Sequence, residues 1–234
     1  MICRRSIAML ALTVAACGQA DPQPSAQSSE AVGQSAAPAA DRAIAGPERR
    51  ILAFGDSLFA GYGVGIENSY PAQLQTALRK DGINARIVNA GVSGDTTAAA
   101  RQRLAFTLDA QKVPPELVLL ELGGNDMLRA LSPAETRANF AAMLDELAKR
   151  KIPVLLMGMR APPNYGADYQ RAFDAIYADL GKREGVTLVP FWLETVYQRP
   201  ELFQADRLHP TVEGLGVLVG ATKEAVKGAL PPAA

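Results

Sequence analysis

Ile51-Leu52-Ala53-Phe54-Gly55-Asp56-Ser57-Leu58 is the stretch that decides the fold and on which the functional interpretation rests. Its first four residues form a short apolar run, which is typical of a buried β-strand. The glycine, aspartate and serine that follow all favour turns, so the stretch alone is compatible with a simple turn. A serine just past a buried strand also lies where α/β proteins carry their chemistry. The rest of the chain has to distinguish these two interpretations.

Apolar runs of strand length alternate with helical patterns after this stretch. The predicted strands are Ile51–Phe54, Ala85–Asn89, Leu117–Glu121, Val154–Met157 and Val186–Val189. The predicted helices cover about Tyr70–Lys80, Thr97–Asp109, Pro133–Lys151, Asp168–Arg183 and Thr211–Gly228. This alternation predicts an α/β fold with a five-stranded parallel sheet that is covered by helices on both faces. Ligands of such sheets bind beyond the carboxyl ends of the strands, so the loops after the strands are the candidate site.

The composition of the 234-residue chain is that of an ordinary globular protein, with 48% hydrophobic and 21% charged residues. Lysine plus arginine and aspartate plus glutamate both number 24, so no excess of positive charge indicates a nucleic acid partner. After the N-terminal segment, about 180 residues remain, which is enough for one domain with a core of its own.

The first 16 residues have the pattern of a bacterial export signal. Arg4 and Arg5 precede an apolar segment, Ile7–Ala16, that is too short to span a bilayer. The end of this segment, Val14-Ala15-Ala16-Cys17, resembles the lipobox of bacterial lipoproteins, in which the cysteine is acylated and becomes the new N-terminus. The alternative is an ordinary secretory signal peptide that is cut near the same small residues.

The predicted organisation is therefore a signal peptide over residues 1–16, a flexible tether over 17–50 and one globular domain over 51–230. The tether is rich in proline, glutamine, serine and alanine and cannot bury enough apolar surface to become ordered. Acylation of Cys17 would attach the mature protein to a membrane that faces the periplasm; otherwise the protein is expected to be soluble in the periplasm. Since Cys3 is then removed and Cys17 carries lipid, a thiol mechanism is excluded.

The glycine-rich loop after the first strand does not fit the known phosphate-binding patterns. Gly61-Tyr62-Gly63-Val64-Gly65 lacks the third glycine of G-x-G-x-x-G, since Ile66 stands there, and no P-loop motif is present. The nucleophile elbow G-x-S-x-G is also missing, because Phe59 occupies its last position. Nucleotide binding and the α/β-hydrolase fold with that elbow are therefore not supported.

Two later loops contain groups suited to holding an oxyanion. Gly94 follows the second strand, where a backbone N–H can point into a site, and Asn125 follows Gly123-Gly124 after the third strand with a side-chain amide. Each loop is equally compatible with a simple turn. Ser93 is a rival nucleophile, but no neighbouring residue singles it out.

His209 is the only histidine in the chain, so any histidine-dependent chemistry has to use it. Asp206, three residues earlier on a turn closed by Pro210, can reach one imidazole nitrogen and leave the other free to take a serine proton. A lone histidine is more often a surface residue. One histidine and no free cysteine make a metal site improbable, and no cofactor is expected.

Taken together, four loops resemble the blocks of the SGNH (GDSL) hydrolase family in order and spacing. The blocks are Gly55-Asp56-Ser57-Leu58, Gly94-Asp95-Thr96, Gly123-Gly124-Asn125-Asp126 and Asp206-x-x-His209-Pro210. Further stretches resemble the bacterial branch of arylesterases, thioesterases and lysophospholipases, namely Ala60-Gly61-Tyr62-Gly63, Pro162-Pro163-Asn164-Tyr165-Gly166 and Pro200-Glu201-Leu202-Phe203-Gln204-Ala205-Asp206. The resemblance implies a flavodoxin-like three-layer α/β/α sandwich. One departure is Arg207, where that branch usually has glycine.

The family's mechanism, carried over to these positions, implies Ser57 as nucleophile, His209 as its base and Asp206 as the residue that orients the histidine. It also implies that Ser57 lies on a helical turn. The implied oxyanion donors are the backbone N–H groups of Ser57 and Gly94 and the side chain of Asn125. Asp56 and Asp126 are expected to be structural braces.

The expected substrates are carboxylic esters, either aryl esters or esters with short-to-medium acyl chains, with thioesters and lysophospholipids as further possibilities that the resemblance implies. An acyl groove is expected to include Tyr62, Tyr165, Met127 and Leu128, although each could equally be a packing residue. Two alternatives stay open at this point. One is a carbohydrate O-deacetylase, and the other is a lipid-anchored binding protein without turnover.

Overall fold

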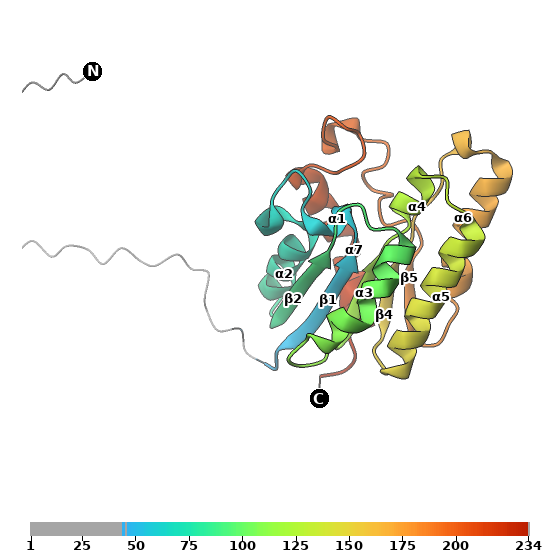
Figure 1. Cartoon of the computed structure of the whole chain (residues 1–234). Coiled ribbons are helices and arrows are strands. Elements are labelled where there is room, and N and C mark those ends of the chain that lie inside the picture. The colour runs from blue at the N-terminus through green and yellow to red at the C-terminus, as the bar shows by residue number, and fades with distance from the viewer. Residues whose placement is uncertain (1–43, 45, 234) are drawn as a thin grey trace, which may run out of the picture. The chain divides into compact units, whose positions relative to one another are not determined.

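The computed structural model describes residue 44 and residues 46–233, so the predicted signal peptide and most of the predicted tether lie outside the described residues. The strands of the sheet are β1 (Arg49–Gly55), β2 (Ala85–Gly91), β3 (Leu117–Glu121), β4 (Val154–Met157) and β5 (Val186–Val189). They form a five-stranded parallel sheet in the order β2-β1-β3-β4-β5 (Figure 1). The predicted sheet is confirmed, with β1 and β2 longer than the sequence indicated.

Five helices of three turns or more cover the sheet. They are α2 (Tyr70–Lys80), α3 (Thr97–Asp109), α5 (Pro133–Lys149), α6 (Ala167–Leu180) and α7 (Val212–Ala229). Helices α2 and α7 pack together, whereas α3, α5 and α6 form the opposite layer, with α3 and α5 in front of the strands and α7 behind them in Figure 1. The expected three-layer α/β/α sandwich is confirmed. None of the helices in the described part of the chain is long and apolar enough to span a bilayer.

The helix ends follow from local chemistry, and they correct two predicted boundaries. The predicted α5 extends to Lys151, but the helix ends earlier because Lys151 takes a left-handed conformation at φ 60°. The N–H of Ile152 then donates to the carbonyl of Leu147 at 3.0 Å and closes the helix end. Helix α6 ends at Leu180, before Gly181, rather than at Arg183 as predicted.

Short helices lie in the loops at the carboxyl edge of the sheet. They are the α-helices α1 (Ser57–Ala60) and α4 (Gly124–Leu128) and the 3₁₀ turns η1 (Ile66–Asn68), η2 (Pro163–Tyr165) and η3 (Pro200–Leu202). The helical turn that the family resemblance implied for Ser57 is therefore present as α1. Helix α4 stands where the sequence predicted a plain loop.

The strand register brings the candidate loops to one level. Gly55 at the end of β1 pairs with Gly91 on β2 and with Glu121 on β3, so these three strands end side by side. The loops that follow them are therefore neighbours in space although they are far apart in the sequence. Below this edge the core is continuous, and the rings of Phe59, Tyr70 and Trp192 pack together with centroids 5.2 to 5.8 Å apart.

Candidate active site

Ser57 is presented at the carboxyl edge of the sheet by a sharp change from strand to helix. β1 ends at Gly55, and Asp56 caps α1 by accepting a hydrogen bond from the N–H of Leu58 at 3.0 Å. A Cβ atom on Gly55 would come within 2.8 Å of the carbonyl oxygen of Glu121, so only glycine fits the crossing between β1 and β3. Ser57 is the first residue of α1 and lines an open groove.

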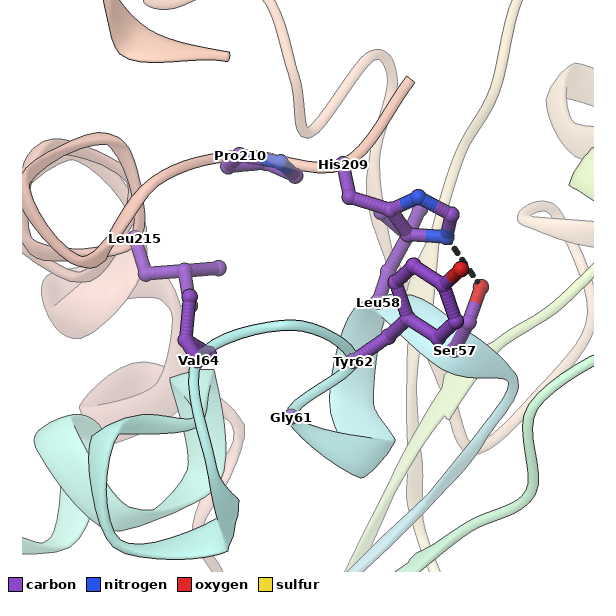
Figure 2. Close-up of a pocket in the computed structure, with 8 residues that line it drawn as sticks. All are labelled: Ser57, Leu58, Gly61, Tyr62, Val64, His209, Pro210 and Leu215. Carbon is purple, nitrogen blue, oxygen red and sulfur yellow. Dashed lines mark hydrogen bonds between the residues drawn. The ribbon is translucent and has the colours of Figure 1, made fainter. Parts of the chain in front are cut away.

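The hydroxyl of Ser57 lies in a hydrogen-bonded series with the chain's single histidine. Ser57 Oγ is 2.8 Å from His209 Nε2, and His209 Nδ1 is 2.7 Å from Asp206 Oδ2 (Figure 2 shows the first of these contacts). A carboxylate only accepts hydrogen bonds, so Nδ1 carries the proton and Nε2 accepts from the serine. The structure thus brings His209 to Ser57, from which it is separated by 152 positions in the sequence, together with Asp206. This is the geometry of a serine activated by a histidine base.

The loop that carries Asp206 and His209 is held by its own backbone. Asp206 Oδ1 accepts hydrogen bonds from the N–H groups of Leu208 at 2.9 Å and His209 at 3.0 Å. Partial burial acts to raise the pKa of Asp206, but these two N–H groups and the imidazole outweigh it and lower the pKa to about 2. The carboxylate therefore stays ionised over the whole working range of an enzyme and holds the imidazole in one orientation.

Tyr62 and Gln204 fasten this loop to the segment after α1. The amide of Gln204 donates to the carbonyl of Tyr62 at 2.9 Å and to that of Pro210 at 3.0 Å. The ring of Tyr62 packs on the imidazole of His209, with centroids 4.2 Å apart, and Figure 2 shows it beside the Ser57–His209 hydrogen bond. The imidazole is thus positioned by an aromatic face as well as by Asp206.

The residues expected to supply the oxyanion donors all line one groove. They are Ser57, Gly94 and Asn125. Within the described part of the chain, the N–H groups of Ser57 and Gly94 donate to no protein acceptor. Asn125 donates one amide hydrogen to Asp56 Oδ2 at 3.0 Å, which leaves its second amide hydrogen for a ligand. The arrangement offers up to three donors to a negatively charged oxygen beside Ser57.

Asp56 and Asp126 act as braces for these loops, as expected from the sequence. Asp126 is buried and accepts hydrogen bonds from the N–H and the hydroxyl of Thr97 and from the hydroxyl of Thr136. It thereby ties the Asn125 loop to the start of α3, directly after the Gly94 loop. Asp56 does the same for Ser57, because it holds both the first turn of α1 and the amide of Asn125.

Arg103 is a further positioning residue that the sequence did not reveal. Its guanidinium donates to the carbonyl of Gly55 at 3.0 Å, to that of Ala90 at 2.9 Å and to Asp95 Oδ2 at 2.6 Å, and it lies 4.0 Å from the ring centroid of Phe54. One side chain on α3 thus joins the ends of β1 and β2 to the Gly94 loop. An arginine in a helix carries no sequence signal for such a role.

Glu121 is a buried carboxyl group directly below the serine loop. Its side chain is fully buried at the end of β3, where Oε2 accepts from the N–H of Asp56 at 3.3 Å and Oε1 has no partner in the described part of the chain. Burial, and then the negative charge of Asp56, raises the pKa of Glu121 well above its ordinary value. Burial also raises the pKa of Asp56, to about 6. Burial therefore favours the protonated form of Glu121 in the folded protein. The sequence contains a signal for this buried group, because Glu121 ends the otherwise apolar run Leu117–Glu121.

The protonated state of Glu121 predicts a pH dependence of stability. Because its pKa is raised on folding, the stabilisation is complete below the unfolded-state value of about 4.5 and is lost as pH rises toward the folded-state value. The loss is about 1.4 kcal/mol for each pH unit in this window. Glu121→Gln removes this titration, so its free energy of unfolding should fall less steeply than that of the wild type between pH 5 and pH 9.

Urea unfolding at pH 5, 7 and 9 measures this difference. The comparison uses the slopes with pH, so a constant packing cost of the glutamine cancels. Parallel slopes for the wild type and the variant would show that Glu121 is ionised in the folded protein.

The groove that contains these groups is large and mixed in character. It encloses about 1400 Å³ and continues from Ser57 along the loops after β3, β4 and β5. Tyr62, Met127 and Leu128 line it, as the sequence predicted. Tyr165 was predicted with them, but it stacks on Tyr169 at 5.3 Å and is not among the lining residues. The described residues include no group of three or more histidine, cysteine, aspartate and glutamate side chains that could hold a metal ion.

Comparison with known proteins agrees with this site. The model of the GDSL-like Lipase/Acylhydrolase family matches residues 53–216. An arylesterase of Vibrio mimicus is 41% identical over 164 residues, which are 70% of this chain and 81% of that protein. The protein named thioesterase 1/protease 1/lysophospholipase L1 of Escherichia coli K12 is 39% identical over 160 residues, which are 68% of this chain and 74% of that protein.

Among solved structures, the esterase AlinE4, described as a member of the SGNH-hydrolase family, is 62% identical with a TM-score of 0.68. The match covers 80% of this chain and 99% of that one. Two further structures of AlinE4 carry an alanine in place of a serine and of an aspartate, and those positions are separated by 149 residues, as Ser57 and Asp206 are. Together with the match of the family model over most of the chain, these findings show that the chain belongs to the GDSL-like lipase/acylhydrolase family, as its four sequence blocks predicted, and is a carboxylic ester hydrolase.

Proposed function

We propose that Ser57 is the nucleophile of this hydrolase and that the reaction proceeds through an acyl-enzyme. Ser57 Oγ attacks the ester carbonyl while His209 Nε2 takes the hydroxyl proton, and Asp206 keeps the imidazole in the required tautomer. The tetrahedral intermediate collapses when His209 returns that proton to the departing alcohol oxygen. A water molecule, deprotonated by His209, then attacks the acyl-enzyme. His209 returns that proton to Ser57 Oγ as the bond between Oγ and the acyl carbon breaks, which releases the acid and restores the free serine.

The negative charge of both tetrahedral intermediates falls on the former carbonyl oxygen. We assign its stabilisation to the N–H groups of Ser57 and Gly94 and to the free amide hydrogen of Asn125. Support comes from the position of all three residues in the lining of one groove and from the absence of competing protein acceptors for the two N–H groups in the described residues. Asp56 and Arg103 act through these groups as positioning residues.

The observation that carries the assignment is the 2.8 Å contact between Ser57 Oγ and His209 Nε2, with Asp206 on the other imidazole nitrogen. A fluorophosphonate probe tests it, because such probes phosphonylate a serine only when a base activates it. Peptide mass spectrometry is expected to find the label on Ser57 in the wild type. An unlabelled wild type, or a label on Ser93, would contradict the assignment.

We further propose that the substrates are aryl esters and esters with short-to-medium acyl chains, with thioesters and lysophospholipids as further members of the range. The apolar side chains of Met127, Leu128 and Phe191 along the groove support an acyl-binding role. The names of the similar proteins, an arylesterase and a thioesterase/lysophospholipase, point to the same classes. An exported protein encounters little acyl-CoA, which favours oxygen esters.

A substrate series distinguishes this range from carbohydrate deacetylation. Initial rates for p-nitrophenyl acetate, butyrate and octanoate are compared with acetate release from an acetylated sugar. We expect the three aryl esters to be hydrolysed at higher kcat/KM than the sugar ester. The opposite order would identify a deacetylase of the same family.

For the N-terminal region, which lies outside the described residues, we propose lipid attachment through Cys17 and a location on a membrane facing the periplasm. The support is the sequence Val14-Ala15-Ala16-Cys17 after a short apolar segment. Mass spectrometry of the mature N-terminus in a bacterial host is the test. An acylated N-terminal Cys17 is expected, and an unmodified N-terminus at any position would exclude the anchor.

A further inference from the structure

Arg207 has an unusual backbone conformation for its residue type. In the described part of the chain, three residues other than glycine have a positive φ, and they are Ala130, Lys151 and Arg207 at φ 57°. The first two directly follow α4 and α5, where a left-handed residue commonly ends a helix. Arg207 follows no helix and lies inside the loop between Asp206 and His209. Its conformation therefore has another cause.

The cause is the way in which the loop holds Asp206. The N–H of Arg207 donates to the carbonyl of Gln204 at 2.9 Å, and the next two N–H groups turn back to Asp206 Oδ1. This reversal requires a left-handed residue at position 207. Glycine adopts that conformation without cost, whereas an arginine is strained by its Cβ atom. The backbone therefore explains the positive φ but not the presence of an arginine.

The side chain of Arg207 also has no partner among the residues that the structure describes. It is exposed and lines the groove beside His209, and among the described residues no carboxylate lies within ion-pair distance of its guanidinium. Nor does the guanidinium donate a hydrogen bond to any described residue. A strained arginine that stabilises nothing in the fold is a candidate for a role in ligand binding.

Arg207 lies in a groove with more positive than negative charge. Arg160 lies over the ring of Phe191 at 5.1 Å, and Arg199 is paired with Glu201 at 3.1 Å. Glu194 is the one exposed carboxylate among the described lining residues. Of the arginines that line the groove, Arg207 is therefore the one nearest to His209 in the sequence. Its guanidinium is neither stacked on an aromatic ring nor paired with a carboxylate of the described residues.

We propose that Arg207 binds an anionic group on the alcohol part of the substrate, so that the enzyme favours esters whose leaving group carries a carboxylate or a phosphate. The mechanism indicates why the anion belongs to the alcohol part. His209 has to reach the leaving alcohol oxygen to protonate it, and Arg207 lies two residues from His209 on the same loop. A guanidinium binds both anions through paired N–H groups. This inference rests on the roles proposed above for Ser57 and His209.

Two matched pairs of esters test the proposal. The first is 4-carboxyphenyl butyrate with its neutral methyl ester analogue, and the second is an acylglycerol phosphate with the neutral monoacylglycerol of the same chain. For each pair the measured quantity is the ratio of kcat/KM, anionic over neutral, in the wild type, in Arg207→Gly and in Arg207→Asn. Asparagine tolerates the left-handed conformation, so this variant removes the charge and retains the backbone.

Both variants are expected to lower the ratio for at least one pair by about three- to fivefold at low ionic strength, which is the effect of one exposed charge pair. Added salt should reduce the wild-type ratio toward that of the variants. The pair with the larger effect identifies the preferred anion. The control is Arg86→Gln, an exposed arginine on β2 at the opposite edge of the sheet, for which no change in the ratio is expected.

Unchanged ratios in both Arg207 variants, with the neutral esters still hydrolysed by the wild type, would overturn this inference and leave the proposed function standing. A drop in Arg160→Gln that is absent in the Arg207 variants would assign the anion to Arg160 and contradict the proposal. p-Nitrophenyl succinate carries its anion on the acyl part of the ester. If the Arg207 variants lower kcat/KM more for this ester than for the esters with an anionic leaving group, Arg207 binds the acyl side, which contradicts the proposal. If the wild type hydrolyses no neutral ester at all, the proposed function itself fails.

Discussion

Ser57→Ala is expected to lower kcat for p-nitrophenyl butyrate by about 10⁴-fold or more. Without Oγ no acyl-enzyme forms, and His209 Nε2 loses the partner that it holds at 2.8 Å in the wild type. The fold should be unaffected, because the Ser57 side chain forms a single hydrogen bond with the described residues, the one to His209. Steady-state kinetics, together with a urea unfolding curve that matches the wild type, measures the effect.

Ser93→Ala is the matched control for this prediction. Ser93 lines the same groove, directly before Gly94, but forms no hydrogen bond with His209 in the structure. It should retain activity within about threefold of the wild type, which is the size of a typical effect of a surface substitution. If Ser57→Ala retained substantial turnover and Ser93→Ala lost it, the nucleophile would be Ser93.

Asn125→Ala is expected to lower kcat by about 10²- to 10³-fold with a much smaller change in KM. The free amide hydrogen of Asn125 stabilises the oxygen only when it has become negatively charged, so the loss falls on the transition state rather than on binding. Kinetics over a full range of substrate concentration separates kcat from KM. Unchanged turnover would remove Asn125 from the set of oxyanion donors.

Two comparisons separate this role from a loss of structure. Asn84→Ala also removes a hydrogen bond that an asparagine side-chain amide donates, in this case to the backbone carbonyl of Gly46 at 3.2 Å. Asn84 lies at the opposite edge of the sheet, so this variant should leave kcat unchanged. The free energy of unfolding of Asn125→Ala is also measured, since Asp56 Oδ2 loses one donor in this variant. If unfolding of the variant accounts for the whole fall in kcat, the role of Asn125 as an oxyanion donor is contradicted.

Much of the fold could be predicted from local patterns. All five strands were located, and the bounds of β3, β4, β5, α2 and α3 agree with the prediction. Buried parallel strands are recognisable as short apolar runs, and Ser69 and Thr96 mark the starts of α2 and α3 as N-cap residues. These signals depend on neighbours in the sequence, so they can be interpreted without the tertiary structure.

The short elements at the active edge were harder to predict. Helix α4 stands over Gly124-Asn125-Asp126, which favour turns, because Asp126 is held from outside by Thr97 and Thr136. Tyr165 was assigned to the groove and packs instead on Tyr169. In both cases contacts with distant residues decide the outcome, and local propensity carries no information about them.

The sequence by itself identified Ser57, Asp206 and the single histidine as the candidate catalytic groups, since the composition includes no other histidine and the blocks follow in the family's order. Only the tertiary structure decided that Ser57 Oγ meets His209 Nε2 at 2.8 Å and that Arg103 joins the ends of β1 and β2 to the Gly94 loop. It also decided that Glu121 is buried with no partner for Oε1 among the described residues. The physical reason is that β1, β2 and β3 end at the same level of the sheet. The loops after them therefore bring residues that are far apart in the chain within hydrogen-bond distance, where electrostatic interactions between them are strong.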